Sequence, residues 1–285
     1  MAARRLPTII PSLTQKESLE VTRIHSVAGL LPQETGLISY APFRMPHHSA
    51  SNEGIIGGGK CLKPGEVSLA HRGILFLDEA PEFKKSLLQS LREPIEQEQV
   101  TIVRAGQSIR FPSSLQLIMA ANPCPCGNLG RNEQVCVCSI HEVHRYWRKM
   151  GGALLDRIDI RVPIKPVNCN QLMGDSDESS KVIKERVLRV VEIQAQRFKG
   201  FCFWRNAKIP PGLIHKFCYI DQESMTILGK AFNKLSLSSR AYHSILRVSR
   251  TIADIDGSAS IKKNHVLEAI QHRRYGDDNY FWECA

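Results

Sequence analysis

The chain has 285 residues, of which 42% are apolar and 23% are charged, and its net charge is +10. This composition is typical of a globular protein, and no run of about 18 uncharged apolar residues exists that would cross a membrane. The first residues lack the apolar segment of a signal peptide, so we expect a cytoplasmic protein with no membrane partner. The positive charge suits a polyanion such as nucleic acid, although basic proteins without such a partner are also common.

The first half of the chain has the pattern of an α/β domain. The run Gly73–Leu77 is apolar or small throughout, which predicts a strand buried on both faces of a parallel sheet. We further expect a helix at 12–31, an amphipathic helix at 84–97, a β-hairpin at 99–111, a second buried strand at 115–119 and a third within 154–164.

The second half has a helical period after a polar connector at 166–180. Helices are expected at 181–198, 221–235, 238–257 and 262–274. We therefore predict an α/β domain with a parallel sheet and flanking helices at residues 1–168, followed by an all-α domain at residues 169–285.

Two carboxylates, Asp78 and Glu79, end the first predicted strand, at the edge of a parallel sheet where ligands bind. An aspartate there can hold Mg²⁺ through water, and a glutamate can polarise the water that attacks a terminal phosphate. Asn122 ends a neighbouring strand, and its amide can hold that water or a phosphate oxygen. The alternatives are an ordinary acidic turn and an ordinary Asn-Pro turn.

Arginines of the second half are further candidates. Arg157 can neutralise charge on a transferred phosphate if it is supplied across a subunit boundary, or it can be a surface side chain paired with its acidic neighbours. Arg240 lies near the start of a predicted helix, from which it can reach a nucleotide. Arg247 and Arg250 of the same helix are expected to be solvated or in contact with nucleic acid.

Four cysteines lie in one short loop, in two C-x-C pairs separated by nine residues: Cys124, Cys126, Cys136 and Cys138. Four thiolates so close in sequence can enclose Zn²⁺ tetrahedrally, and the clustering favours a structural metal. Free thiols or a redox pair are the alternatives.

Two other polar segments have less specific patterns. Arg44, His47 and His48 are interpreted as a polar contact loop, because adjacent histidines on a strand point apart and would not share a metal. The hairpin arginines, Arg104 and Arg110, can follow a phosphate backbone, but the preferred interpretation is an ordinary hairpin with solvated arginines.

The segment Gly54–Lys60 matches G-x-x-x-x-G-K, the pattern of a phosphate-binding loop. Such a loop joins a buried strand to a helix, and a Ser or Thr after the lysine binds Mg²⁺. Here Cys61 occupies that position, and Pro64 and Gly65 prevent a helix from following at once. We therefore interpret the segment as a chance match and not as a phosphate loop.

Five segments resemble the magnesium-chelatase-like AAA+ ATPases of the ComM/YifB family in their residues, their order and their spacing, and the resemblance covers nearly the whole chain. They are PFRMPHHSASN, GILFLDEAPEF, MAANPCPCG, LLDRIDIRVP and LSSRAYHSILRVSRTIAD. The resemblance implies an AAA+ core followed by a helical lid, with ATP and Mg²⁺ as ligands. It implies that Asp78 and Glu79 form the Walker B motif and that Asn122 is sensor 1. Arg157 would be the arginine finger and Arg240 the sensor 2 arginine.

Members of that family are similar to hexameric ring motors, and ComM is regarded as a DNA branch-migration helicase of natural transformation. The resemblance therefore implies DNA as partner and a homo-oligomeric ring. The family has its Walker A loop just before a segment like MAARRLP, so we expect this chain to lack that loop and its strand. We accordingly expect no ATP hydrolysis by the chain alone.

Two alternatives remain open. One is a non-catalytic subunit that donates Arg157 in trans to a neighbour with its own phosphate loop. The other is a magnesium-chelatase-type motor subunit, against which the C-x-C pairs and the segment NPCPCG argue.

Overall fold

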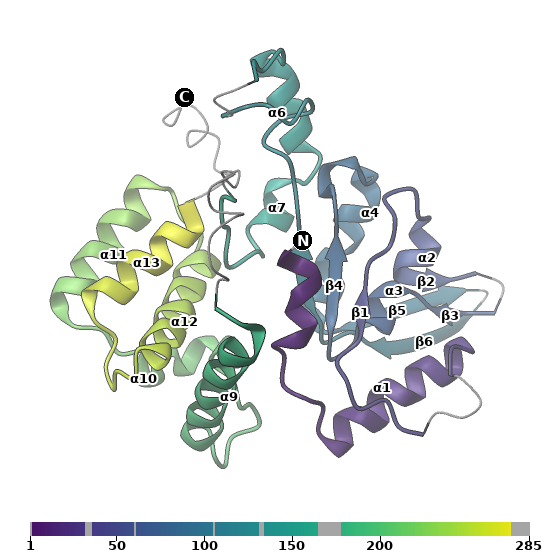
Figure 1. The fold of residues 1–285 in the computed structure, drawn as a ribbon, viewed down its shortest axis with the longest axis horizontal. Coiled ribbons are helices and arrows are strands. Elements are labelled where there is room, and N and C mark those ends of the chain that lie inside the picture. The colour runs from purple at the N-terminus through teal and green to yellow at the C-terminus, as the bar shows by residue number, and fades with distance from the viewer. Residues whose placement is uncertain are drawn as a thin grey trace. The chain divides into compact units, whose positions relative to one another are not determined.

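The computed structural model describes residues 2–31, 36–59, 61–104, 106–130, 134–164 and 178–274. The chain forms two compact units, Met1–Leu155 and Asp156–Ala285 (Figure 1). The first unit is α/β and the second is helical, as the sequence predicts. The units divide at Leu155, ahead of the boundary expected after residue 168. Among the described helices, none is long and apolar enough to cross a lipid bilayer.

The first unit contains a three-stranded parallel sheet. Its strands, in spatial order, are β1 (Phe43–Arg44), β4 (Ile74–Leu77) and β7 (Gln116–Met119), of which β1 and β4 are labelled in Figure 1. β4 is buried along its whole length, which confirms the strand predicted to be covered on both faces. β7 is only partly buried, because in the described part of the chain it is an outer strand of this sheet.

Gly73 allows β1 to approach β4 closely. A Cβ atom at this position would lie 2.0 Å from the backbone oxygen of Pro42, well inside van der Waals contact. That oxygen accepts a hydrogen bond from the amide of Ile74 at 2.8 Å. The start of the sheet therefore requires a residue without a side chain.

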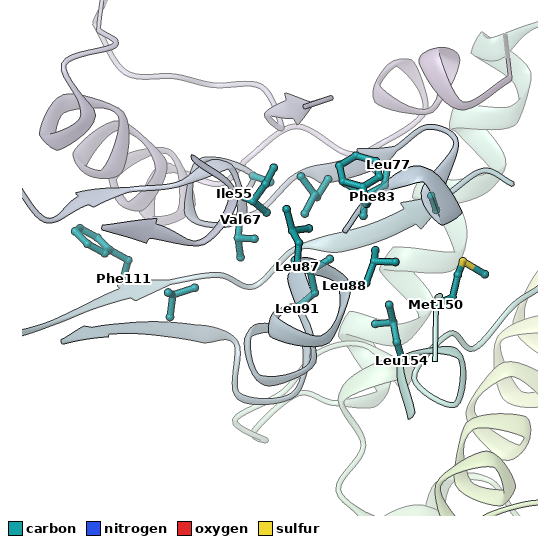
Figure 2. Packing of buried hydrophobic residues seen from close by; sticks show 14 of the residues in the cluster. Ile55, Val67, Leu77, Phe83, Leu87, Leu88, Leu91, Phe111, Met150 and Leu154 are labelled. Atoms are coloured by element: carbon teal, nitrogen blue, oxygen red, sulfur yellow. The ribbon is translucent and has the colours of Figure 1, made fainter. Parts of the chain in front are cut away.

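Short helices surround the sheet. The first unit contains the 3₁₀ helices η1 (Ala2–Thr8) and η2 (Ala80–Glu82) and the α-helices α1 (Gln15–Ala28), α2 (Asn52–Ile56), α3 (Glu66–Leu69), α4 (Lys85–Ser90), α5 (Arg92–Gln97), α6 (Ile140–Arg148) and α7 (Gly152–Leu155). Buried apolar residues of α2, α3, α4 and α7 form one cluster with β4, and Figure 2 shows Leu87, Leu88 and Leu91 within it.

The single helix expected at 84–97 is in fact two helices, α4 and α5, so that prediction is wrong in its middle. Pro94 gives the physical reason. It has no N–H to donate, and its ring crowds the carbonyl of Ser90 four residues earlier, so the hydrogen-bond ladder is broken between them.

The predicted β-hairpin is confirmed. β5 (Gln99–Arg104) pairs with β6 (Gln107–Pro112) in antiparallel register. Ile102 and Phe111 are buried and join the core cluster, whereas Arg104 and Arg110 are exposed. A smaller antiparallel ribbon joins β2 (Gly57–Gly58) to β3 (Lys63–Pro64).

The third predicted strand is absent, because the described residues 156–164 contain no strand. Their backbone is bound instead by α13 (Lys263–Arg274) of the helical unit. The amide of Arg161 donates to the carbonyl of His272 at 2.8 Å, and Arg273 donates to the carbonyl of Ile158 at 2.6 Å. These groups would otherwise form the ladder of a strand, and the alternating residues Ile160 and Val162 remain more than half exposed at 52% and 56%.

The second unit consists of helices. They are α9 (Ser180–Arg197), η3 (Asn206–Lys208), η4 (Pro211–Leu213), α10 (Ile214–Phe217), α11 (Gln222–Lys234), α12 (Ser239–Ile255) and α13 (Lys263–Arg274). The four predicted helices are confirmed. The side chains of Ser179, Asp221 and Ser238 accept hydrogen bonds from first-turn amides of α9, α11 and α12, which sets where each helix begins.

A buried carboxylate links the helices of this unit. Asp254, whose side chain is 1% exposed, accepts hydrogen bonds from Arg197 at 2.8 Å, Asn206 at 2.8 Å and Arg250 at 3.0 Å. Burial by itself would raise the pKa of Asp254, but the hydrogen bonds from Arg197 and Asn206 and the charge of Arg250 lower it below its ordinary value. The carboxylate is therefore ionised in the folded protein.

We predict that Asp254→Ala lowers the free energy of unfolding of the full chain by about 3–5 kcal/mol, because it leaves buried arginines without their anion. Because the folded pKa lies below the ordinary value of 3.8, this stabilisation is complete above pH 3.8 and is lost as the pH falls through the folded pKa. Urea unfolding at several pH values should show the difference between wild type and variant shrinking in acid.

The matched control is Glu223→Ala, which breaks the exposed ion pair of Glu223 with Lys263. Water screens an exposed pair, so it contributes little to stability and the control should unfold like the wild type. Equal effects of both substitutions would contradict the role given to Asp254.

Candidate functional site

The carboxyl ends of β4 and β7 form one edge of the sheet, where polar residues gather. Leu77 and Met119 are paired, so the chain leaves both strands at the same level. Beyond that pair the amide of Ala120 donates to Leu77 at 2.9 Å, and the amide of Ala80 donates to Ala120 at 2.8 Å. These bonds tie the turn after β4 to the segment after β7. The structure therefore brings Asp78, Glu79 and Asn122 to one edge, which we call the acidic edge.

Asp78 and Glu79 occupy an exposed turn. The amide of Glu79 donates to Oδ1 of Asp78 at 3.1 Å, which fixes that carboxylate against the backbone. Glu79 has φ of 50°, in the left-handed region that non-glycine residues seldom adopt. Such conformations persist where the surrounding structure imposes them, and they gather at functional sites. Two solvent-facing carboxylates on a fixed turn can hold a hydrated divalent cation and polarise a water molecule.

His48 also lies at the acidic edge, which the sequence analysis did not predict. Its Nδ1 is 4.0 Å from Oε2 of Glu79, and its ring meets Phe83 edge-on at 6.4 Å. The expectation that His47 and His48 point apart is wrong, because they lie in a turn and their ring centroids are 4.0 Å apart. No pattern in the sequence predicts this position, because the short strand β1 and its parallel pairing with β4 are seen only in the fold.

Arg44 does not belong to this edge. Its guanidinium makes two hydrogen bonds to the carboxylate of Glu66, at 2.6 and 2.7 Å. This bidentate pair joins β1 to α3 and is a structural contact.

Asn122 is exposed, and the segment around it is held by α6. The indole N–H of Trp147 donates to the carbonyl of Pro123 at 3.0 Å. Burial, together with the negative charge of Glu82, raises the pKa of Tyr146 to about 12, despite a hydrogen bond from the backbone of Asn122 that lowers it. Tyr146 therefore stays neutral beside the Asn122 backbone. Neither aromatic contact was predicted from the sequence.

The four clustered cysteines come together directly after Asn122. The Sγ of Cys124 lies 3.3 Å from that of Cys126 and 3.6 Å from that of Cys136, and all four sulfur atoms, including that of Cys138, lie within 4.8 Å of one another. Thiolates around a tetrahedral zinc ion, with bonds of about 2.3 Å, are about 3.8 Å apart. The four sulfur atoms therefore have the separations of a tetrahedral thiolate metal site.

The contacts within the cysteine cluster favour a thiolate at Cys126 alone. A backbone hydrogen bond from Asn128 and the thiol of Cys124 lower the pKa of Cys126 to about 6, whereas desolvation and the neighbouring sulfur atoms raise the pKa of Cys136 and raise that of Cys138 to about 12. The amide of Leu129 points at Sγ of Cys124 at 3.4 Å, as backbone amides do around metal-bound thiolates. Cys61, Cys202 and Cys218 are free thiols outside this cluster, and Cys169 and Cys284 lie outside the described residues.

The segment Gly54–Lys60 does not have the geometry of a phosphate loop. Its first residues end α2, Gly57 and Gly58 form β2, and β3 follows in antiparallel pairing; Lys60 itself lies outside the described residues. A Cβ at Gly57 would lie 2.8 Å from the backbone oxygen of Lys63, so this glycine serves close packing of the ribbon. A helix precedes the glycines, where a phosphate loop has a buried strand.

Arg157 belongs to the helical unit, on a segment that is fixed at both sides. Asp156 accepts hydrogen bonds from Ser238 at 2.9 Å and Arg273 at 2.7 Å, and Asp159 accepts one from Ser244 at 2.5 Å. The two acidic neighbours of Arg157 are thus bound to residues of α12 and α13. The backbone that carries Arg157 is held rigidly by these contacts.

Arg240 lies in the first turn of α12, two residues after Ser238, the residue that contacts Asp156. The helical unit therefore brings the Arg157 segment next to the start of the helix that carries Arg240. The expectation for the other two arginines is wrong. Arg247 donates to the carbonyl of Ile209 at 2.6 Å, and Arg250 is buried against Asp254, so both hold the helical unit together.

A parallel sheet with carboxylates and an amide after adjacent strands, followed by a helical unit with positioned arginines, defines an AAA+ type of core and lid. The family model "Magnesium chelatase, subunit ChlI" matches residues 1–172, and the model of its C-terminal region matches residues 177–273. The chain belongs to this magnesium-chelatase-like family of AAA+ proteins.

The relatives refine this placement. The chain is 41% identical over 278 residues to the competence protein ComM of Haemophilus influenzae and 38% identical over 275 residues to YifB of Salmonella typhimurium. Each match covers 96% of this chain and 53% of the relative, so the chain spans about half the length of these curated relatives. A more distant match, 24% identical over 217 residues, is the DNA replication licensing factor Mcm6 of Drosophila pseudoobscura, covering 74% of this chain and 25% of that protein.

Proposed function

We propose that the chain supplies the acidic edge and the arginines of an AAA+ ATPase that uses ATP hydrolysis to move on DNA. Asp78 and Glu79 act as its Walker B motif and Asn122 as sensor 1. Arg157 acts as the arginine finger and Arg240 as the sensor 2 arginine. The parallel pairing of β4 with β7 is the observation that supports this most, because it holds two carboxylates and an amide at one edge of the sheet.

Each group has a distinct part in the chemistry. Asp78, fixed by the amide of Glu79, would hold Mg²⁺ through water, and a bound ion would supply positive charge to the phosphates. Glu79 polarises the attacking water, and the Asn122 amide orients it. Arg157 neutralises the charge that builds on the transferred phosphate, which requires a rigid backbone such as the one that Ser238, Ser244 and Arg273 provide.

Grip on the β- and γ-phosphates comes from a phosphate loop, through its backbone amides and its lysine. The one segment of the chain with the G-x-x-x-x-G-K pattern, Gly54–Lys60, forms the end of a helix and an antiparallel ribbon in its described residues. We propose that ATP is gripped by a phosphate loop outside residues 1–285, and that the chain alone does not hydrolyse ATP.

DNA is proposed as partner, with a hexameric ring as the working assembly and branch migration as the activity. The net charge of +10 favours a polyanion. Among the relatives, one is named a competence protein and another a DNA replication licensing factor. These names belong to those proteins, and DNA is inferred for this chain from them together with its charge.

We predict no ATP hydrolysis above background for the purified chain alone. Mixed with a full-length ComM relative that has a phosphate loop, the chain should add hydrolysis beyond that of the relative, if Arg157 completes sites in trans. Arg157→Ala should then lower the added hydrolysis rate about 10³-fold, because an arginine finger raises kcat by a factor of about 10³–10⁵. Phosphate release is the measurement.

The matched control is Arg189→Ala, which removes an exposed arginine of α9 and should leave the added rate unchanged. Hydrolysis by the chain alone that Lys60→Ala abolishes would show that Gly54–Lys60 is the phosphate loop after all. An added rate that is insensitive to Arg157→Ala would contradict the role of that arginine.

We further propose Zn²⁺ at the cysteine cluster. Four thiolates with tetrahedral spacing suit zinc, which has no redox chemistry and forms closed structural sites. The ion would clamp the segment after Asn122 and so hold one side of the acidic edge in place.

We predict about one equivalent of zinc in protein purified under reducing conditions, and its loss in Cys124→Ser. The control Cys202→Ser changes an exposed thiol outside the cluster and should retain the metal. Removal of zinc by a chelator should change the fluorescence of Trp147, whose indole is bonded beside Cys124. Less than about half an equivalent in fresh protein would refute the zinc site.

A further inference from the structure

Helix α6 begins directly after the cysteine cluster. One face of the helix is packed against the protein and the other faces solvent. Ser139, next to Cys138, caps the helix, and the carboxylate of Glu142 accepts the Ser139 amide at 2.8 Å in return. Val143 and Tyr146 are 3% and 5% exposed and pack inward. The opposite face of α6 is therefore held in a defined orientation towards solvent.

That open face is cationic. His141, Arg145 and Arg148 recur at intervals of four and three residues, which places them on one side of the helix, and all three are exposed. With His144 they line a hollow of about 240 Å³. Glu142 is the single acidic residue of α6, and its carboxylate is used in the helix cap. Within the described residues, neither Arg145 nor Arg148 forms an ion pair.

Apolar side chains flank these cations. Val135 and Val137 are 85% and 83% exposed, and Ile140 is 56% exposed. The two valines alternate in sequence with Cys136 and Cys138, whose sulfur atoms join the cluster. The cluster thus holds exposed valines on a loop immediately before a cationic helix face.

We propose that this face of α6 binds a nucleic-acid strand. This inference goes beyond the proposed function and rests on it only for the nucleic-acid partner. The face consists of Val135, Val137, Ile140, His141, Arg145 and Arg148. The arginines bind phosphates, the imidazole of His141 donates a hydrogen bond, and the three apolar side chains pack on bases or sugars.

Nucleic acid fits this surface better than a protein partner does. Arginines three residues apart on a helix are about 5–6 Å apart at their Cβ atoms, a spacing that lets two guanidinium groups reach neighbouring phosphates of one strand. Aliphatic side chains next to cations are a combination found in proteins that insert apolar wedges between bases. An acidic protein surface would satisfy the arginines but would give no role to the valines that the cysteine cluster holds exposed beside them.

The test is fluorescence anisotropy of labelled single- and double-stranded oligonucleotides with the full chain, over a series of salt concentrations. Arg145→Gln combined with Arg148→Gln should weaken binding about tenfold, and the slope of log K against log salt should become less steep by about 1.4–1.8. Val137→Ser should weaken binding with the slope unchanged, because it removes an apolar contact and no charge.

The matched control is Arg186→Gln combined with Arg189→Gln on α9, which removes the same charge from exposed positions. It should change neither the affinity nor the slope. Circular dichroism of each variant checks that the fold is kept.

The outcomes separate this inference from the proposed function. If the wild-type chain binds neither oligonucleotide, the proposal that DNA is its partner is refuted. Normal binding by the wild type and by the α6 variant, or equal loss in the α6 and α9 variants, overturns the α6 face alone. A changed oligomer mass in the α6 variant, with DNA binding intact, would also overturn it and assign the face to a subunit contact.

Discussion

The parallel pairing of β4 with β7 is the constraint on which the candidate site depends. Parallel strands end at the same edge, so the register that sets Leu77 opposite Met119 also determines that two carboxylates and an amide leave the sheet together. The amide of Ala120 donates to Leu77 and the amide of Ala80 donates to Ala120, so the pairing of the two chains continues past the ends of both strands. A shift of one residue would send Asn122 to another level and turn the β7 side chains to the opposite face.

The loop after β7 joins three features that are otherwise separate. It begins at Asn122, gathers four sulfur atoms within 4.8 Å, and ends in the cap of α6. Trp147 of α6 bonds back to Pro123, so the loop is closed on itself by a hydrogen bond as well as by its thiols. A metal in the cluster would therefore stiffen the acidic edge on one side and the cationic face of α6 on the other.

The sequence predicted the features that local patterns determine, and it failed where distant residues decide. The apolar run of β4, the hairpin and the capped helices of the second unit were all predicted correctly. The segment after Leu155 alternates like a strand, but Arg273, more than a hundred residues later, binds its backbone. Arg247 and Arg250 look like surface arginines because the carbonyl of Ile209 and the carboxylate of Asp254 become neighbours only after folding. His48 was missed for the same reason.

Amide hydrogen exchange of the full chain, followed by NMR, tests the shared edge most directly. We predict that the amides of Ala120 and Ala80, which carry the register past the strand ends, are protected like that of Ile74 at the start of β4 and open together with it. Exchange of the first two at the rate of an exposed loop, while Ile74 stays protected, would show that Asp78 and Asn122 are not held at one edge.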